Sequence, residues 1–137
     1  MSLRVRSARA VLREGIVHVA LPVAVGVLIY AIFRYPAFDA LGVADDLPAW
    51  VRYNLPDGLW AYATISIASL PWRENSPHLY LWMLLSFVVV LGYELLQLPN
   101  LVPGVFDPMD VLASVLGLAF GGVLALRRRR RHEFDQG

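Results

Sequence analysis

Four apolar runs take up about half of the 137-residue chain, at residues 16–33, 58–72, 79–98 and 111–126. The first and third runs have 18 and 20 residues, and a helix needs about 20 residues to cross a hydrocarbon core about 30 Å thick. The second and fourth have 15 and 16 residues, so they span it only with their polar flanks or in a locally thinned bilayer. The runs predict an integral membrane protein, and the hydrophobic content of 58%, against about 45–50% in soluble domains, argues against a soluble enzyme.

The arginines indicate how these runs cross the membrane. All twelve basic residues are arginine, and ten of them lie within residues 1–15, 73–78 and 127–131. Short basic segments stay on the cytoplasmic side of a membrane. Four spanning helices with both termini in the cytoplasm place these ten arginines together, whereas three helices would put one cluster outside. We therefore expect an all-α fold, a four-helix transmembrane bundle.

The chain is expected to form a single membrane domain over residues 1–137. The helices are predicted at about residues 14–34, 57–72, 78–98 and 108–127, followed by a basic cytoplasmic tail at 127–137. Residues 35–57 form the one sizeable extracytoplasmic loop, and Asp46-Leu47-Pro48 followed by Trp50 and Tyr53 predicts a short interfacial helix within it.

The tail carries five consecutive arginines, which begin at Arg127 and end at Arg131. They are expected to fix the orientation of the last helix, and they can also contact anionic lipid headgroups at about 1 kcal/mol each. No aromatic residues alternate with them, so nucleic acid is not an expected partner.

With this topology, five polar side chains from three helices fall at one depth near the extracytoplasmic surface. They are Asp57, Glu94, Gln97, Asp107 and Asp110. Glu94 and Gln97 are three residues apart and share a helix face, as do Asp107 and Asp110. The arrangement predicts an outward-facing acidic pocket between the second, third and fourth helices, which binds a cation, a lipid headgroup or a lipid-linked ligand.

Glu94 is the strongest functional candidate because it lies about one turn inside an apolar run, near a helix C-terminus where the macrodipole disfavours an anion. Such a side chain is protonated, hydrogen-bonded or neutralised by a cation, and Gln97 is one candidate partner. A purely structural hydrogen bond is the alternative to a functional role.

The other candidates also have structural interpretations. Asp57 and Asp107 each precede a predicted helix and suit an N-cap, and Asp110 suits the first turn that follows. Trp60 belongs either to the aromatic belt at the membrane surface or to the roof of the pocket. His18 has no second histidine placed to complete a metal site.

The fourth run carries a stripe of small and polar residues, Asp110, Ser114, Gly117 and Gly121. Such stripes lie inside membrane bundles, and the last two form a GxxxG pattern that permits close helix packing.

Three classes of function follow from these residues. The first is a binding protein, whose oxygen ligands would suit a divalent cation or a headgroup. The second is an intramembrane enzyme, with Glu94 as the candidate catalytic acid or base and Glu94, Asp107 and Asp110 as candidate metal ligands. The third is a structural subunit of a larger membrane complex, with another membrane protein as its partner. The chain has no cysteine, which excludes disulfides and thiolate chemistry.

Two stretches resemble the VanZ-like integral membrane proteins. Tyr93-Glu94-Leu95-Leu96-Gln97, then Gly104-Val105-Phe106-Asp107-Pro108-Met109-Asp110, then Gly117 is similar to the E-x-x-Q…(F/R)D-x-x-D…G signature of that family. Leu55-Pro56-Asp57-Gly58-Leu59-Trp60-Ala61-Tyr62 is similar to an LPD-x-LW-x-Y element of one branch of it. The resemblance covers residues 55–121, and it lacks the arginine that many members carry just before the first aspartate.

The resemblance implies a small bacterial inner-membrane protein with a role at the cell envelope. The namesake of the family is associated with low-level resistance to teicoplanin. By analogy, Asp57, Glu94, Gln97, Asp107 and Asp110 would be the polar positions that family members share.

Overall fold

The computed structural model describes residues 8–34, 48–71 and 77–134, and these residues are helical apart from short turns. The elements are α1 (Ala8–Gly15), the π-helix η1 (Ile16–Ala20), α2 (Leu21–Arg34), α3 (Ala49–Tyr53), α4 (Leu55–Ser69), α5 (Pro77–Gln97) and α6 (Pro108–Phe134). No strand occurs within these three ranges, so the predicted all-α fold class is confirmed there.

Three stretches of helix are long and apolar enough to cross a membrane: Val11–Phe33, His78–Gln97 and Pro108–Arg127. The fourth predicted span, α4, has only 15 residues and extends about 22 Å at 1.5 Å per residue. It falls short of a hydrocarbon core about 30 Å thick. The three long apolar helices are therefore compatible with a multi-pass membrane protein, and α4 is not one of the helices long enough to span alone.

The predicted boundaries need several corrections. The first helix begins at Ala8 rather than near residue 14, and α4 occupies Leu55–Ser69 rather than residues 57–72. The last helix continues to Phe134, so most of the predicted basic tail extends α6. The short helix expected within residues 35–57 is present as α3, which begins after Pro48. Asp46, the first residue of the sequence signal for this helix, lies outside the described residues.

The first long helix changes its winding where a proline follows. α1, η1 and α2 run on without a break, and the π-helical turn lies just before Pro22. A proline ring inside a helix clashes with the carbonyl four residues earlier, here that of His18, and cannot donate a backbone hydrogen bond. A wider π turn at that point relieves the clash.

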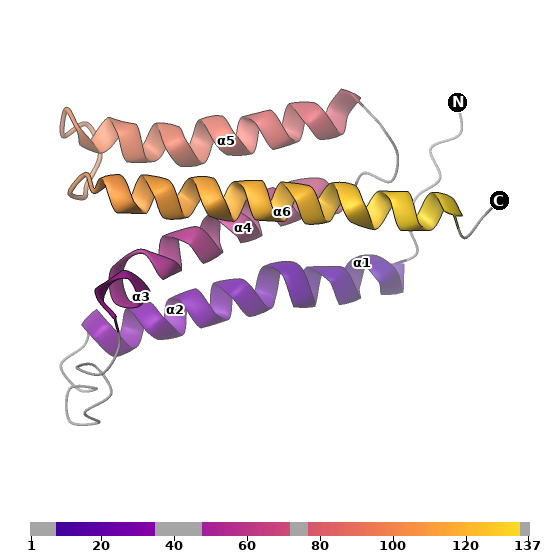
Figure 1. Ribbon diagram of the computed structural model, residues 1–137, viewed down its shortest axis with the longest axis horizontal. Coiled ribbons are helices and arrows are strands. Elements are labelled where there is room, and N and C mark those ends of the chain that lie inside the picture. Colours follow the sequence, from indigo (N-terminus) through magenta and orange to yellow (C-terminus); the bar gives the residue numbers. More distant parts are fainter. Residues whose placement is uncertain (1–7, 35–47, 72–76, 135–137) are drawn as a thin grey trace.

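The short helix α4 lies at the centre of the molecule. It contacts α6 most extensively and also packs against α2, α5 and η1. In Figure 1, α5 and α2 lie on opposite sides of the α4–α6 pair. Small and hydroxyl side chains of α4 are buried, including Ala61, Ala63, Ser66 and Ser69. The 15-residue α4 is thus packed between α6, α5 and the continuous helix formed by α1, η1 and α2.

Glycines allow α4 and α6 to touch at their backbones. A Cβ added to Gly117 would lie 2.1 Å from the carbonyl oxygen of Gly58, and one added to Gly121 would lie 2.4 Å from Ile65 Cγ2. The buried core of Ala61, Ile65 and Leu118 sits at the same contact. The close packing predicted from the GxxxG pattern is present here.

The connection from α5 to α6 is a tight, defined turn. Asn100 has a φ of 57°, its amide donates to the carbonyl of Gln97, and the amide of Leu101 donates to that of Leu96. These bonds and the left-handed residue make a Schellman motif, which ends a helix by satisfying its last carbonyls. The turn returns the chain so that the C-terminal end of α5 and the start of α6 lie at one end of the molecule, together with α3 and the start of α4 (Figure 1).

We predict that Gly117→Ala lowers the free energy of unfolding by about 1–3 kcal/mol, because an overpacked contact forces backbones apart. The matched control is Gly92→Ala on α5, where an added Cβ meets nothing within 4 Å. Alanine favours a helix over glycine, so this control should equal or exceed the wild type in stability. Unfolding in uncharged detergent, followed by circular dichroism, measures both, and equal stability of the two variants would contradict the close contact.

Candidate functional site

A partly polar cavity of about 420 Å³ lies at the end of the molecule where α3, the start of α4, the C-terminal end of α5 and the start of α6 meet. Its lining residues are Tyr30, Phe33, Arg52, Tyr53, Pro56, Asp57, Tyr93, Glu94, Gln97, Gly104, Val105, Asp107 and Asp110. We call it the acidic cavity, because it holds four carboxyl groups and one guanidinium.

The structure brings together five of the six side chains singled out from the sequence. Asp57, Glu94, Gln97, Asp107 and Asp110 all line the acidic cavity, although they come from three different helices and the turn before α6. Both Asp107 and Asp110 lie close enough to Glu94 to interact with it electrostatically. Like charges at such range repel strongly away from bulk water, so the cavity favours an occupant of positive charge.

Glu94 is the most buried of these acids. Its side chain is 8% exposed, it lines the cavity, and within residues 8–34, 48–71 and 77–134 nothing hydrogen-bonds to its carboxyl group. The predicted bond to Gln97 is not formed. The side chain as a whole is buried, but its carboxyl oxygens reach the open space of the cavity, where they can accept a hydrogen bond from a donor that enters it.

The two aspartates at the start of α6 have structural partners. Asp107 is the N-cap, because its Oδ1 accepts a bond of 2.8 Å from the amide of Met109. Asp110 accepts a bond of 2.6 Å from Nδ2 of Asn54. The capping interpretation of Asp107 is therefore confirmed, and its carboxyl group still faces the cavity.

Asp57 is not the cap of its helix. α4 begins at Leu55 with a proline in its first turn, and Asn54 occupies the N-cap position. Asp57 lies one turn further along, where a negative charge still interacts favourably with the helix dipole. The expectation of a cap at Asp57 was wrong by three residues, because Asn54-Leu55-Pro56 is the stronger helix start.

Gln97 is held by the turn that follows α5. Gly104 has a φ of +137°, a conformation that side chains rarely adopt. An added Cβ there would lie 2.7 Å from Gln97 Nε2. The hydroxyl of Tyr93 donates to the carbonyl of Pro103 at 3.2 Å. These contacts fix the rim of the cavity against α5.

Trp60 does not line the acidic cavity. Its indole packs over Gly26 of α2, where an added Cβ would lie 2.7 Å from the indole nitrogen. Its ring centroid is 6.1 Å from that of Tyr30, which does line the cavity. Trp60 thus supports a cavity wall from behind rather than roofing the site.

The described residues contain no group of three His, Asp or Glu side chains placed to hold a metal ion. Glu94, Asp107 and Asp110 share the cavity without forming such a group. His18 lies elsewhere, where its Nδ1 and the hydroxyl of Tyr62 form a hydrogen bond between η1 and α4.

Arg52, Asn54 and the aromatic lining of the cavity were not predicted from the sequence. Arg52 points its guanidinium over the ring of Phe33, with 5.6 Å from Cζ to the ring centroid. The sequence did contain a clue to Arg52, because it is one of only two arginines outside the basic segments. Asn54 could have been found from the proline two residues later. Tyr30 and Tyr93 gave no signal, since tyrosines near helix ends are common in membrane proteins.

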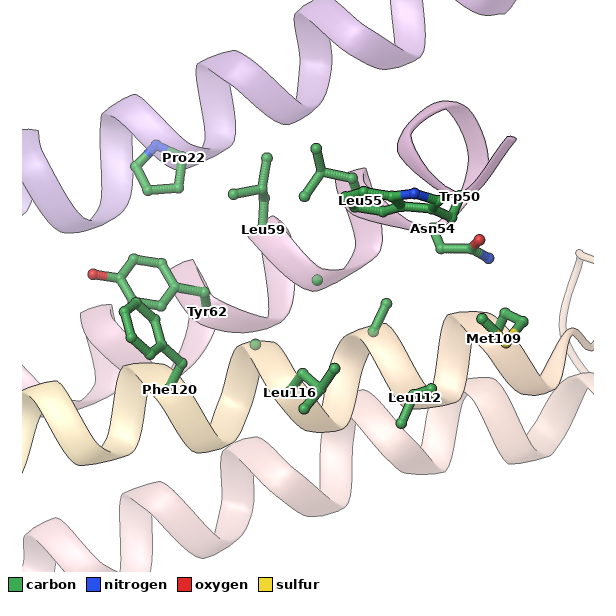
Figure 2. Close-up of a pocket in the computed structure, with 13 residues that line it drawn as sticks. Pro22, Trp50, Asn54, Leu55, Leu59, Tyr62, Met109, Leu112, Leu116 and Phe120 are labelled. Atoms are coloured by element: carbon green, nitrogen blue, oxygen red, sulfur yellow. The ribbon is translucent and has the colours of Figure 1, made fainter. Parts of the chain in front are cut away.

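A second cavity, also of about 420 Å³, lies between α2, α4 and α6 and is almost wholly apolar. Figure 2 shows side chains from three helices around it: Pro22 from α2, Leu55, Leu59 and Tyr62 from α4, and Met109, Leu112, Leu116 and Phe120 from α6. We call it the apolar groove.

No family model, no curated protein and no solved structure matches the chain.

We predict that Asn54→Ala lowers the free energy of unfolding by about 1.5–3 kcal/mol, the usual contribution of a hydrogen bond to a charged group. The control is Thr64→Ala, whose hydroxyl donates to the carbonyl of Trp60 in its own helix and whose loss should have little effect. Chemical unfolding in detergent compares them, and an unchanged Asn54→Ala midpoint would mean that this bond does not stabilise the start of α6.

Proposed function

We propose that the chain is a VanZ-like membrane protein of the bacterial inner membrane, with four membrane-crossing helices and both termini in the cytoplasm. The resemblance in residues 55–121 and the three long apolar helices support this assignment. α4 would cross as the enclosed fourth helix, since its neighbours, rather than lipid, surround it on several sides. The start of α1 and the last turns of α6 lie at the same end of the molecule (Figure 1), opposite the acidic cavity.

The proposed orientation predicts how single cysteines react, and the natural chain has no cysteine to interfere. Ala44→Cys should react with a membrane-impermeant maleimide added to intact spheroplasts, whereas Gln136→Cys should react only after the membrane is permeabilised. The opposite pattern would invert the topology and place the acidic cavity on the cytoplasmic side.

We further propose that the acidic cavity binds the positively charged headgroup of a membrane amphiphile. The observation that carries this function is Glu94, which is nine-tenths buried, lines the cavity and lacks a hydrogen-bond partner among the described residues. An ammonium group has three donors and no acceptor. It would supply both the charge and the hydrogen bonds that this carboxyl group lacks.

The lining favours an organic cation over a metal ion. Four aromatic side chains, Tyr30, Phe33, Tyr53 and Tyr93, share the wall with the carboxyl groups, and aromatic faces attract organic ammonium ions. A volume of about 420 Å³ lies in the range of small-molecule sites, about 300–1,000 Å³. A headgroup fills such a space, whereas a bare ion would leave most of it empty.

Arg52 adds one cationic group to the same wall. A guanidinium binds phosphate through paired donors, so a headgroup with both an ammonium and a phosphate would find partners of both signs. This chain has no arginine just before Asp107, where VanZ-like proteins can carry one. Arg52 of α3 contributes a guanidinium to the cavity instead.

The binding proposal is tested by lipid selection. The full-length protein in uncharged detergent is incubated with equal amounts of phosphatidylethanolamine and phosphatidylglycerol of the same chains, and native mass spectrometry measures the bound ratio. Glu94→Gln should reduce the preference for the amine-headed lipid about tenfold, because a charge-assisted bond contributes about 1.5–3 kcal/mol.

The matched control is Glu14→Gln on α1, which makes the same chemical change outside the cavity and should keep the wild-type ratio. Because the arginines at the chain ends are unchanged in both variants, their attraction for anionic lipid cancels in the comparison. Identical ratios for wild type and Glu94→Gln would refute the proposal.

A further inference from the structure

The apolar groove has a floor without side chains. Gly58 and Gly117 lie at the α4–α6 contact, and both line the groove. Larger apolar side chains form its walls, with Leu59 on α4 and Leu112 and Leu116 on α6 (Figure 2). The result is an apolar groove bordered by side chains of several helices, a lining that suits a hydrocarbon chain.

The length of the groove along α6 matches the thickness of the hydrocarbon layer in one leaflet of a membrane. Along α6 it runs from Met109 to Phe120, a rise of roughly 16 Å at 1.5 Å per residue. Half of a hydrocarbon core about 30 Å thick is about 15 Å. At the inner end, Tyr62 and Phe120 close the groove, with 5.9 Å between their ring centroids.

The groove starts at the level of the acidic cavity. Asn54 lines the groove, Asp110 lines the cavity, and the hydrogen bond of 2.6 Å between them forms the boundary. α3 contributes Trp50 to the groove and Arg52 to the cavity. A charged, partly aromatic compartment and an apolar one therefore meet at the end of the molecule where a lipid headgroup would lie.

A second apolar groove lacks this relation. It lies between α4 and α5 and includes Ile67, Trp82 and Leu85, near the opposite end of α5 from Glu94. None of its lining residues belongs to the acidic cavity. Binding of a hydrocarbon chain in this second groove can therefore be compared with binding in the first.

We propose that the acidic cavity and the apolar groove form one two-part site for an amine-headed lipid, whose headgroup lies in the cavity and whose hydrocarbon chain lies in the groove. This inference rests on the proposed function of the cavity. Moving a chain from bilayer to groove exchanges one apolar medium for another, so the headgroup provides the selectivity. The groove then holds the lipid in one position beside α4 and α6.

The test uses an amine-headed phospholipid with a photoreactive diazirine in the middle of one acyl chain. It is incorporated with the full-length protein into bilayer nanodiscs, irradiated, and the labelled residues are mapped by peptide mass spectrometry. Labelling is expected on Leu59, Leu112 and Leu116. A glycerol-headed lipid with the same chain should label these positions at least fivefold less.

Matched variants identify the groove as the chain site. Leu116→Trp fills it with an indole, and Leu84→Trp on α5 makes the same change at a residue of equal exposure, 61% against 60%, outside both compartments. Leu116→Trp should reduce labelling of Leu59 and Leu112 at least fivefold, and Leu84→Trp should leave it unchanged. Glu94→Gln should also reduce it, because the headgroup anchor is lost.

Two results would overturn the inference. Labelling that is unaffected by Leu116→Trp, or that falls mainly on Leu85 and its neighbours, would place the chain elsewhere, while the lipid selection through Glu94 could still hold. The second result is groove labelling that Leu116→Trp blocks but that is equal for both headgroups and unchanged in Glu94→Gln. It would show that the groove binds a hydrocarbon chain independently of the cavity.

Discussion

The backbone contact between α4 and α6 is the interaction on which the rest of the structure depends. Gly58, Gly117 and Gly121 let the two helices approach until side chains of one touch the backbone of the other. Close packing of small residues is the main source of helix association inside a membrane, where lipid is as apolar as the protein. Near the start of α6, Asn54 hydrogen-bonds to Asp110, and along the same contact Gly58 and Gly117 form the floor of the apolar groove.

The acidic end of the molecule shows how differently three carboxyl groups behave in one place. Asp107 caps a helix and Asp110 accepts a side-chain amide, so each has a partner within the protein. Glu94 is enclosed and without one among the described residues. Its carboxyl oxygens face the cavity and can accept a hydrogen bond from a molecule that enters it. That contrast singles out Glu94 from acids of similar appearance in the sequence.

Polar and apolar compartments that share a boundary suit an amphiphilic ligand better than either a free ion or a plain hydrocarbon. The Asn54–Asp110 bond separates them, and α3 places an arginine on one side and a tryptophan on the other. The buried position of α4 has a related consequence. The start of α4 places Pro56 and Asp57 in the wall of the acidic cavity and Leu55 and Leu59 in the apolar groove, so this one helix borders both compartments.

The sequence by itself determined the helical class, the long apolar helices, the close packing of the glycine stripe and the gathering of five polar residues at one end. Hydrophobic run length and local spacing decide these features, and both can be read along a single chain. It placed the start of α4 too late, left Trp60 open between the aromatic belt and the roof of the cavity, and gave no site prediction for Arg52 and Asn54. Only the tertiary structure decided which acid lacks a partner and where the two compartments meet, because a buried group's surroundings come from other helices and depend on how those helices cross.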